Sequence, residues 1–311
     1  YNRGALQSKE ELTLVKIDLI TGFLGSGKTT FIKKYAKYLI DSGKNIGILE
    51  NDYGAVNVDM MLLQDLMGDH CELEMVSGGC DKYCHRRRFK TKLIAMGMCG
   101  YDRVIVEPSG IFDVDEFFDA PREDPLDKWY EIGNVIAIAD AGLPEQMSKD
   151  AEYLLGSEAA DAGLVFVSKL DESSKEQADT ILPHINRAME AISCTRKLSE
   201  EDVMKKKWDE LTNDDWNRIL TCGYHTESWQ KRDVEDDKSF SSLSFMNLPL
   251  TKEQILNAAT QILGDPSCGH VHRIKGFLET TDGWFELNAT AAQRQLNPIA
   301  NGQQIIIVIG E

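Results

Sequence analysis

Residues 21–30 read TGFLGSGKTT and match the pattern G-x-x-x-x-G-K-[ST] in full. An apolar strand is predicted just before this stretch, at 14–20, and a helix just after it, where apolar residues recur at helical spacing until Ser42-Gly43. In such a loop the backbone N–H groups point into one concavity, and the following helix adds the positive end of its dipole. A glycine-rich turn without a ligand is the alternative, which the strand and helix on either side disfavour. The stretch therefore predicts a polyphosphate-binding loop.

The side chains of this loop predict how it holds its ligand. Lys28 would reach the β- and γ-phosphates as a point charge, and the Thr29 hydroxyl would hold a bridging Mg²⁺. The predicted nucleotide-binding residues of the loop are Gly22, Gly25, Ser26, Gly27, Lys28, Thr29 and Thr30. A nucleotide with bound Mg²⁺ is therefore the expected ligand.

The composition favours a globular protein with an excess of acidic residues. Its 311 residues, 42% hydrophobic and 27% charged, are enough for two domains. A formal net charge of −17 argues against a nucleic-acid partner, because phosphate backbones need clustered Lys and Arg. No apolar run is long enough to span a bilayer, and the first residues lack the features of a secretory signal, so no membrane association is expected. The seven cysteines then suggest thiols in the reducing cytoplasm.

Further strand candidates follow the first helix, and their pattern predicts the fold class. They are apolar or β-branched throughout rather than alternating, which is typical of strands buried on both faces of a parallel sheet. The candidates are residues 45–50, 103–107, 134–139 and 163–168. With helices between them, residues 12–195 predict a doubly wound, mostly parallel α/β domain that binds ligands at the carboxyl ends of its strands.

The remainder of the chain changes character twice. Residues 196–237 are polar and strongly charged, with three tryptophans, and predict a helical connector. Residues 238–311 predict a smaller α+β domain with one helix over 251–263. Its strand candidates are residues 241–245, 271–278, 284–287 and 304–309.

Two acids follow predicted parallel strands and are candidates for the chemistry at the phosphates. Asp52, in the stretch ENDYG, could hold the water shell of the metal or orient the attacking water, although turns also favour aspartate. Glu107, in the stretch VIVEPSG, is placed to sense Mg²⁺. Gly110 could offer its backbone N–H to a γ-phosphate and move when that phosphate leaves. Together with Lys28, these three residues are the predicted catalytic set.

Ser168-Lys169-Leu170-Asp171 ends another predicted buried strand and bears on the choice of base. Asp171 could accept both N–H donors on the guanine edge, which adenine cannot match, and the Lys169 stem could lie over the base. In isolation such a segment is weak evidence, and a solvated turn explains it better. In combination with the upstream phosphate loop, the segment favours GTP over ATP.

The stretch SGGCDKYCH, residues 77–85, brings two thiols and an imidazole close together. Cys80, Cys84 and His85 match the ligand set that Zn²⁺, Ni²⁺ or Co²⁺ prefers, and Glu50 could add a carboxylate if its loop approaches. Buried cysteines that act as small hydrophobic residues are the alternative. The pattern leaves both interpretations open.

Taken together, these motifs resemble the CobW-like branch of the P-loop GTPases that assist metal-centre assembly, relatives of the urease and hydrogenase accessory GTPases. The stretches that carry the resemblance are GFLGSGKTT, ENDYG, SGGC, VIVEPSG, SKLD and, at 273–276, RIKG. They extend over nearly the whole chain. The resemblance implies a GTPase domain followed by a CobW-type C-terminal domain, slow Mg²⁺-dependent hydrolysis of GTP to GDP and phosphate, and delivery or insertion of a metal or metallocofactor.

The resemblance also implies roles for individual residues. Lys28 and Thr29 would carry the phosphates and Mg²⁺, with Asp52 in the outer shell of the metal. Asp52 and Glu107 would be the switch acids, and Lys169 with Asp171 would read guanine.

Two positions depart from the pattern of the family. The family typically carries C-x-C-C directly after the glycine, whereas here Asp-Lys-Tyr separates Cys80 from Cys84. Either His85 replaces the lost ligand, or the chain has lost metal transfer and kept only the switch. Ser168 stands where many GTPases place Asn, and selectivity for guanine should survive through Asp171.

A second group of metal-competent residues precedes the RIKG stretch. Cys268, His270 and His272 alternate at period two, so on an extended backbone all three would point to one face. They could form a second metal site, or they could be exposed strand positions, and the sequence identifies no further ligand for them.

Three functions compete at this point. The first is a GTP-driven metallochaperone for Zn, Co or Ni, with a client metalloprotein as its partner and a homodimer left open. The second is a GTP-dependent activator that docks onto a metalloenzyme or a corrinoid (cobalamin) protein and carries no metal itself. The third is a P-loop kinase or ATPase acting on a small molecule, which Asp171 opposes.

Overall fold

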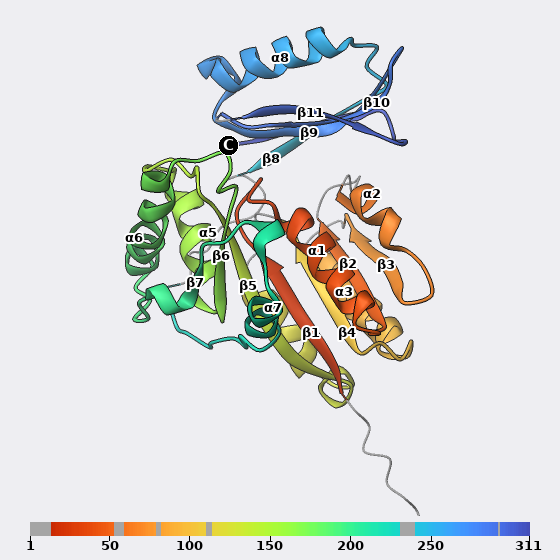
Figure 1. The fold of residues 1–311 in the computed structure, drawn as a ribbon, viewed down its shortest axis with the longest axis vertical. Coiled ribbons are helices and arrows are strands. Elements are labelled where there is room, and N and C mark those ends of the chain that lie inside the picture. The colour runs from red at the N-terminus through yellow and green to blue at the C-terminus, as the bar shows by residue number, and fades with distance from the viewer. Residues whose placement is uncertain (1–13, 53–58, 79–81, 110–113, 231–239, 292) are drawn as a thin grey trace, which may run out of the picture.

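Two β-sheets of different kinds organise the chain (Figure 1). The computed structural model describes residues 14–52, 59–78, 82–109, 114–230, 240–291 and 293–311. A parallel sheet lies in the larger lower part, and an antiparallel sheet lies above it. Among the residues described, no helix combines the length and the apolar character that crossing a bilayer would need.

The larger sheet has seven strands in the order β3-β2-β4-β1-β5-β6-β7, and every neighbouring pair is parallel. Along the chain these strands are β1 (Val15–Thr21), β2 (Ile46–Asp52), β3 (Cys71–Ser77), β4 (Arg103–Pro108), β5 (Tyr130–Asp140), β6 (Leu164–Ser168) and β7 (Val203–Met204). The central strands are buried on both faces, as their continuous apolar runs predict. The predicted doubly wound parallel sheet is confirmed.

The two strands that the sequence did not predict lie at the edges of this sheet. β3 is not buried throughout, because Glu72 and Glu74 interrupt its apolar positions and Met75 is exposed. β7 is only two residues long and falls within the stretch predicted as a connector. An edge strand has one neighbour, so it needs neither the length nor the apolar continuity of a central strand. The predicted division at 12–195, 196–237 and 238–311 stays a prediction.

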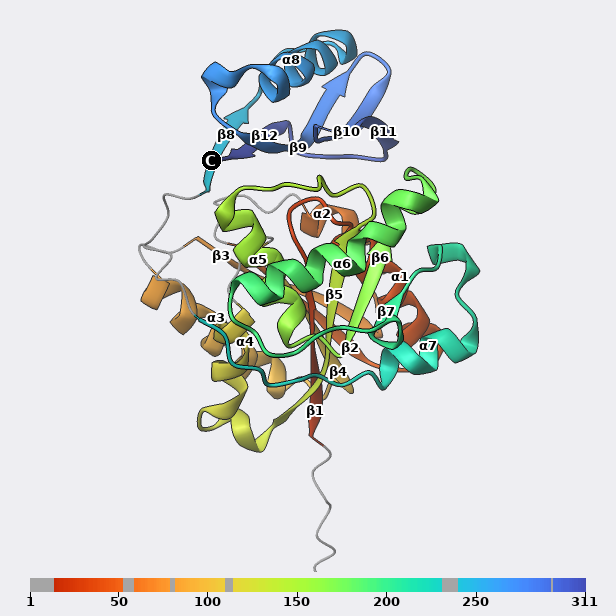
Figure 2. The ribbon, with the colours of Figure 1, turned by 90° about the vertical axis from the view of Figure 1, so that its left-hand side faces the viewer.

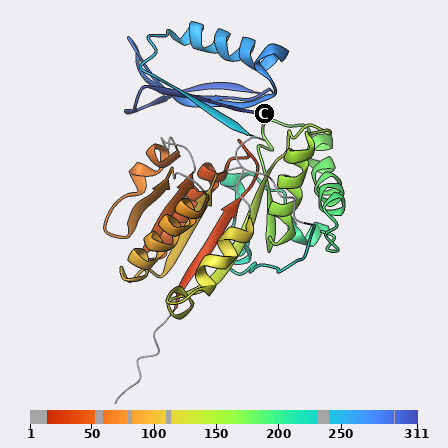
Figure 3. The same ribbon diagram turned by 180° about the vertical axis from the view of Figure 1, so that it is seen from behind.

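Helices cover both faces of the parallel sheet (Figures 1 and 3). One face packs against α1 and α7, with Phe31 and Trp216 in its core. The opposite face packs against α3 to α6. The helices of this part are α1 (Lys28–Asp41), α2 (Asp59–Leu63), α3 (Lys82–Gly97), α4 (Val114–Asp119), α5 (Lys149–Ala160), α6 (Lys175–Ala191) and α7 (Asn213–Leu220). Short 3₁₀ helices are η1 (Gln64–Leu66), η2 (Ala120–Arg122), η3 (Leu126–Lys128), η4 (Glu200–Asp202), η5 (Trp208–Glu210) and, further on, η6 (Pro266–Cys268).

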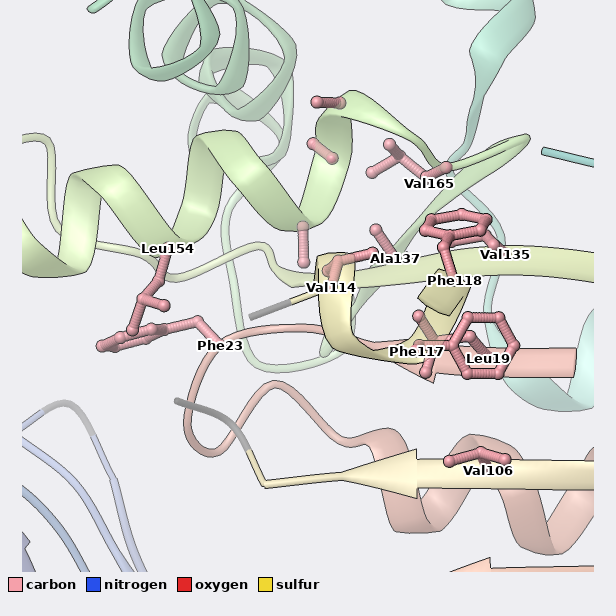
Figure 4. Close-up of a cluster of buried hydrophobic side chains, with 14 of the residues drawn as sticks. Leu19, Phe23, Val106, Val114, Phe117, Phe118, Val135, Ala137, Leu154 and Val165 are labelled. Carbon is pink, nitrogen blue, oxygen red and sulfur yellow. The ribbon is translucent and has the colours of Figure 1, made fainter. Parts of the chain in front are cut away.

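The larger hydrophobic core reaches up to the phosphate loop (Figure 4). Phe23 of the loop is buried and lies beside Leu154 of α5, at one end of the cluster that includes Leu19 and Val106. The loop is therefore anchored by an apolar side chain, which leaves its backbone and its polar groups for the other side.

The smaller sheet is antiparallel, in the order β11-β10-β9-β12-β8, and α8 packs on one of its faces. Its elements are β8 (Ser241–Met246), α8 (Lys252–Gly264), β9 (Val271–Thr280), β10 (Gly283–Ala289), β11 (Arg294–Ile299) and β12 (Ile305–Gly310). The predicted α+β part is confirmed, but the sequence did not predict β11. This edge strand contains Asn297 and Pro298, which central strands disfavour and edges tolerate.

The antiparallel sheet lies over the carboxyl ends of the parallel strands (Figures 1 and 2). α8 is on its far side, so the other face turns towards α2 and the phosphate loop. Met61 and Leu62 of α2 pack against a small cluster around the buried Phe277 of β9. Lys275 Nζ donates a hydrogen bond to Asp59 Oδ2 at 2.5 Å across the same boundary. Ligands at the strand ends would therefore lie between the two sheets.

Candidate nucleotide-binding site

The phosphate loop joins β1 directly to α1, as its motif predicts. Gly22, Gly25 and Gly27 have positive φ values of 144°, 75° and 98°. Residues that carry a Cβ atom rarely adopt such backbone angles. A Cβ atom at Gly22 would also lie 2.3 Å from the carbonyl oxygen of Ile138. Alanine would therefore fit at none of these positions without moving the backbone.

Lys28 is buried at the start of α1 and contacts the opposite end of the phosphate loop. Its Nζ donates a hydrogen bond to the carbonyl oxygen of Gly22 at 2.7 Å. Burial lowers the pKa of Lys28, and the negative charges of Glu107 and Glu158 oppose that shift. A phosphate group would supply the counter-charge that this buried ammonium lacks.

Glu158 of α5 is a buried acid close to the same loop. Burial raises its pKa to about 8, and the positive charge of Lys28 opposes that rise. Glu158 was not among the residues predicted from the sequence. A single charged residue in the otherwise small and apolar run YLLGSEAA was the available signal.

Thr29, Glu107 and Glu50 lie together at the strand ends. Thr29 Oγ1 donates a hydrogen bond to Glu107 Oε1 at 2.9 Å, and Glu50 is opposite Glu107 in the pairing of β2 with β4. Burial and the charge of Asp59 raise the pKa of Glu107 to about 7, while Lys28 and hydrogen bonds from Thr29 and Glu50 oppose the rise. Two buried carboxyl groups beside a threonine hydroxyl are oxygen ligands suited to a hard cation such as Mg²⁺.

The segment after β6 contacts the phosphate loop through a serine. Ser168 Oγ donates a hydrogen bond to the carbonyl oxygen of Ser26 at 2.6 Å. Lys169, with a positive φ of 55°, forms an ion pair with Asp140 at 2.6 Å. The serine that departs from the family pattern thus holds the loop directly.

Asp171 lies at the rim of the site. Its side chain is 64% exposed and forms an ion pair with Lys207. Lys169 and Asp171 both line the pocket, and Trp208 lines it nearby. The two residues that the sequence assigns to base recognition are therefore on one wall, with an aromatic ring close by.

The pocket has a volume of about 280 Å³ and lies between the two sheets. The phosphate loop and the end of β6 form one side. The antiparallel sheet forms the other side, which the sequence did not predict to be part of the site. Its contributions are Arg273, Glu286, Asn288, Gln293 and Gln295.

Charges from the antiparallel sheet reach the phosphate end of the pocket. Arg273 has its side chain beside Gly25 and donates from Nε to Asn288 Oδ1 at 3.0 Å. Asp59 is half-buried, and its desolvation by itself would raise its pKa, but the charges of Lys275 and Arg273 outweigh that effect and lower the pKa to about 2. The RIKG stretch was the sequence signal for these cations. No local signal marked Asp59.

For the other predicted residues, the structure either gives no side-chain position or places the side chain among other contacts. Cys80 and Gly110 lie outside the described residues, and for Asp52 the structure describes only the backbone, at the end of β2. Cys84 is a half-buried thiol in α3. His85 is buried, with Nε2 2.7 Å from Asn51 Oδ1 and Nδ1 3.0 Å from the Gly78 carbonyl oxygen. A metal ion at His85 would have to replace one of these two contacts.

The predicted trio of Cys268, His270 and His272 is corrected by the structure. Cys268 belongs to η6 rather than to an extended strand, and Gly269 has a positive φ of 76° that breaks the period of two. His270 and His272 do lie together, with ring centroids 4.4 Å apart. Their third neighbour is Glu311, not the cysteine.

The residues present fit a magnesium nucleotide. Left-handed glycines form the cradle, a buried lysine lies at its base, and Ser26 Oγ is buried with no hydrogen-bond partner among the described residues. Phosphate oxygens accept hydrogen bonds from such groups. Fold and site together define a P-loop nucleotide-binding protein.

Residues 16–196 match the family described as CobW/HypB/UreG, nucleotide-binding domain, and the chain belongs to this family. The resemblance found in the sequence motifs is therefore confirmed.

Among curated proteins, the chain is 25% identical to the zinc chaperone YeiR of Escherichia coli over 54% of its own length and 50% of that relative. It is 26% identical to the zinc chaperone YjiA of the same organism over 52% of each chain. It is 22% identical to the zinc-regulated GTPase metalloprotein activator 1 of Schizosaccharomyces pombe over 84% of its own length and 58% of that relative. The chain thus spans about half the length of the curated relatives it matches.

One solved structure that resembles the chain is that of the Zn(II)-bound YjiA GTPase from E. coli. The match has 19% identity, covers 95% of this chain and 93% of the other, and has a TM-score of 0.38.

Proposed function

We propose that this protein is a GTP-hydrolysing metallochaperone that delivers or inserts a transition metal, Zn, Co or Ni, or a metallocofactor, into a client metalloprotein. The observation that carries the proposal is one pocket lined both by Lys28, Thr29 and Glu107 and by the segment with Lys169 and Asp171, which is proposed to recognise the base. Family membership and the names of the relatives support the metal cargo. The protein acts in the cytoplasm, where its thiols stay reduced.

The phosphate end of the pocket would carry out hydrolysis mainly by positioning and charge. Lys28 gives up its hydrogen bond to the Gly22 carbonyl and binds phosphate oxygens instead. Thr29 and Glu107 would hold Mg²⁺, which neutralises charge on the phosphates. Asp52 and Gly110 are proposed to orient the attacking water and to sense the γ-phosphate. Asp171 would accept the guanine N–H donors once it leaves Lys207.

A continuous set of contacts supports coupling between the nucleotide and the cysteine segment. Thr29 contacts Glu107, which is opposite Glu50 on β2. The next residue of β2, Asn51, contacts His85 at 2.7 Å, immediately after Cys84. A shift of the β2 end upon γ-phosphate loss would therefore be transmitted to α3 and its thiol, Cys84.

The test is to titrate the metal-free full chain with Zn²⁺ in the presence of GDP or of a non-hydrolysable GTP analogue. Linkage requires each ligand to shift the binding of the other by the same factor, and typical couplings are about 5–150-fold. We expect a zinc affinity that differs by at least about fivefold between the two states. Equal zinc affinity in both states would rule the metallochaperone out.

The altered cysteine spacing and the two contacts of His85 favour a second candidate, a GTP-dependent activator that carries no metal. Under this candidate, the double variant Cys80→Ser, Cys84→Ser activates the client as well as the unaltered chain does. A loss of activation in that variant would count against it. The third function, a P-loop kinase or ATPase, is disfavoured by Asp171. A higher affinity of the protein for ATP than for GTP would favour it.

A further inference from the structure

We propose that His270, His272 and Glu311 form a second site for a divalent transition metal of the Zn²⁺ type. One ligand atom from each of these side chains lies within 4.8 Å of the other two. His272 Nε2 is 3.2 Å from Glu311 Oε1, and His270 Nδ1 is 3.9 Å from Glu311 Oε2. Ligands held at about 2.0–2.1 Å in a tetrahedral zinc site are themselves roughly 3.4 Å apart. Small side-chain rotations would therefore bring all three onto one ion.

The backbone brings the end of β12 close to the histidines. The register between β12 and β9 shifts after Ile309, and Glu311 N donates a hydrogen bond to the His270 carbonyl oxygen at 2.9 Å. A Cβ atom at Gly269 would lie 2.6 Å from the Glu311 carbonyl oxygen, so a residue with a side chain would push the two segments apart. The juxtaposition of Glu311 with the histidines depends on this close approach.

The chemistry and exposure of the group fit an exchangeable transition-metal ion. Two imidazoles and one carboxylate suit Zn²⁺ or Co²⁺ rather than Mg²⁺ or Ca²⁺, and three protein ligands leave a fourth position open. The His270 side chain is 63% exposed, whereas those of His272 and Glu311 are 10% and 23% exposed. An ion could therefore bind from solvent at His270 and be held by the two more buried ligands.

The group also contacts the nucleotide-binding part. The His272 ring lies edge-on to that of Phe23 in the phosphate loop, with centroids 5.6 Å apart and an interplanar angle of 86°. Ser148, the N-cap of α5, donates a hydrogen bond to Glu311. The next residue after His272 is Arg273, which lines the pocket. The affinity of this site for metal would therefore differ between the GDP-bound and GTP-bound states. This coupling rests on the proposed function, whereas the existence of the metal site does not.

The experiment uses the full chain with Cys80→Ser and Cys84→Ser, so that the cysteine segment contributes no thiolate, and titrates it with Co²⁺. We expect one bound ion whose spectrum lacks thiolate charge-transfer absorption. His270→Asn and Glu311→Gln should each weaken Co²⁺ binding by at least about tenfold. Even the loss of a residue that only hydrogen-bonds to a metal ligand typically weakens metal binding by that factor or more. The exposed His270 can be changed without disturbing the core, and Gln at 311 keeps an oxygen for Ser148. His225→Asn, at another exposed histidine, and Cys268→Ser should leave the affinity unchanged.

Absence of Co²⁺ binding in the double-cysteine background would overturn the site, as would an unchanged affinity in both His270→Asn and Glu311→Gln. These results leave the metallochaperone proposal standing, because that proposal depends on the unaltered chain and its nucleotide response. Conversely, Co²⁺ binding that depends on His270 and Glu311 supports the site even if the zinc affinity of the unaltered chain is the same with GDP and with the GTP analogue. A Co²⁺ affinity equal in GDP and in the GTP analogue would overturn the coupling through Phe23.

Discussion

Two groups of buried charges in the parallel sheet differ in how completely they are neutralised. Asp18, in the middle of β1, is fully buried and accepts hydrogen bonds from Tyr35 Oη at 2.7 Å, from Arg103 Nη1 at 2.5 Å and from the backbone N of Asn134 at 2.8 Å. This group is charge-balanced and closed. Such a buried network specifies and stabilises one packing arrangement.

The group around Lys28 is different. Burial lowers the pKa of Lys28 and raises those of Glu107 and Glu158 to about 7 and about 8. Each charged form is therefore less favourable there than in water. Perturbed groups of this kind collect at functional sites, where a ligand supplies the missing counter-charge. The comparison indicates that the Asp18 group serves stability and the Lys28 group serves binding.

Lys28→Ala should give the largest effect and should act on binding alone. Charged hydrogen bonds to two phosphates, at about 2 kcal/mol each, correspond to a roughly 1,000-fold loss of GTP affinity. The free energy of unfolding should change little, because removal of one buried charge is offset by the loss of the positive charge beside Glu107 and Glu158. Calorimetric titration with GTP checks this, with Lys37→Ala, an exposed lysine on the same helix, as the control. Equal GTP affinities in Lys28→Ala and Lys37→Ala would show that the Lys28 group does not serve nucleotide binding.

Asp18→Asn should act in the opposite way. It leaves Arg103 buried with its charge uncompensated, which should lower the free energy of unfolding by about 3 kcal/mol. Urea unfolding would measure this. GTP affinity of the folded variant should match that of the unaltered protein, and a variant with normal stability but weakened GTP binding would contradict the comparison.

Asp171→Asn should reduce GTP affinity by roughly 10–100-fold, because two charge-assisted hydrogen bonds to guanine are weakened. ATP binding should not change, since adenine offers no matching donors. Competition with a fluorescent nucleotide would measure both. Asp209→Asn, an exposed aspartate that does not line the pocket, is the matched control. Parallel losses for GTP and ATP would remove Asp171 from base recognition.

Arg273→Ala tests the wall supplied by the antiparallel sheet and should have the smallest effect. Loss of one partly exposed cation from the phosphate end should weaken GTP binding by about tenfold. Arg294→Ala in the edge strand β11 of the same sheet should have no effect, because Arg294 does not line the pocket. If both variants bind GTP like the unaltered chain, the second wall does not contribute.

The sequence predicted what depends on local pattern. The central strands are continuous apolar runs and the phosphate loop is a contiguous motif, so both could be recognised without neighbours. The edge strands β3, β7 and β11 could not, because one-sided burial and short length leave weak patterns.

The site was predicted in part for the same reason. Lys28 and Thr29 lie inside one motif, whereas Asp59 meets Lys275 across 216 positions of sequence, and no spacing rule predicts such a contact. Cys268 shows the limit in the other direction. Cys268 alternates with His270 and His272 in the sequence. In the structure, however, Cys268 belongs to η6, and Gly269, with its positive φ, separates it from the strand that contains the histidines.

The most direct test of the central claim, that the pocket is a guanine-nucleotide hydrolysis site, is phosphate release by the full chain with Mg²⁺ and either GTP or ATP at equal concentrations. We expect Mg²⁺-dependent release from GTP that is at least about tenfold faster than release from ATP at subsaturating nucleotide and that is lost in Lys28→Ala. Release from ATP at an equal or higher rate would show that the pocket is not selective for guanine.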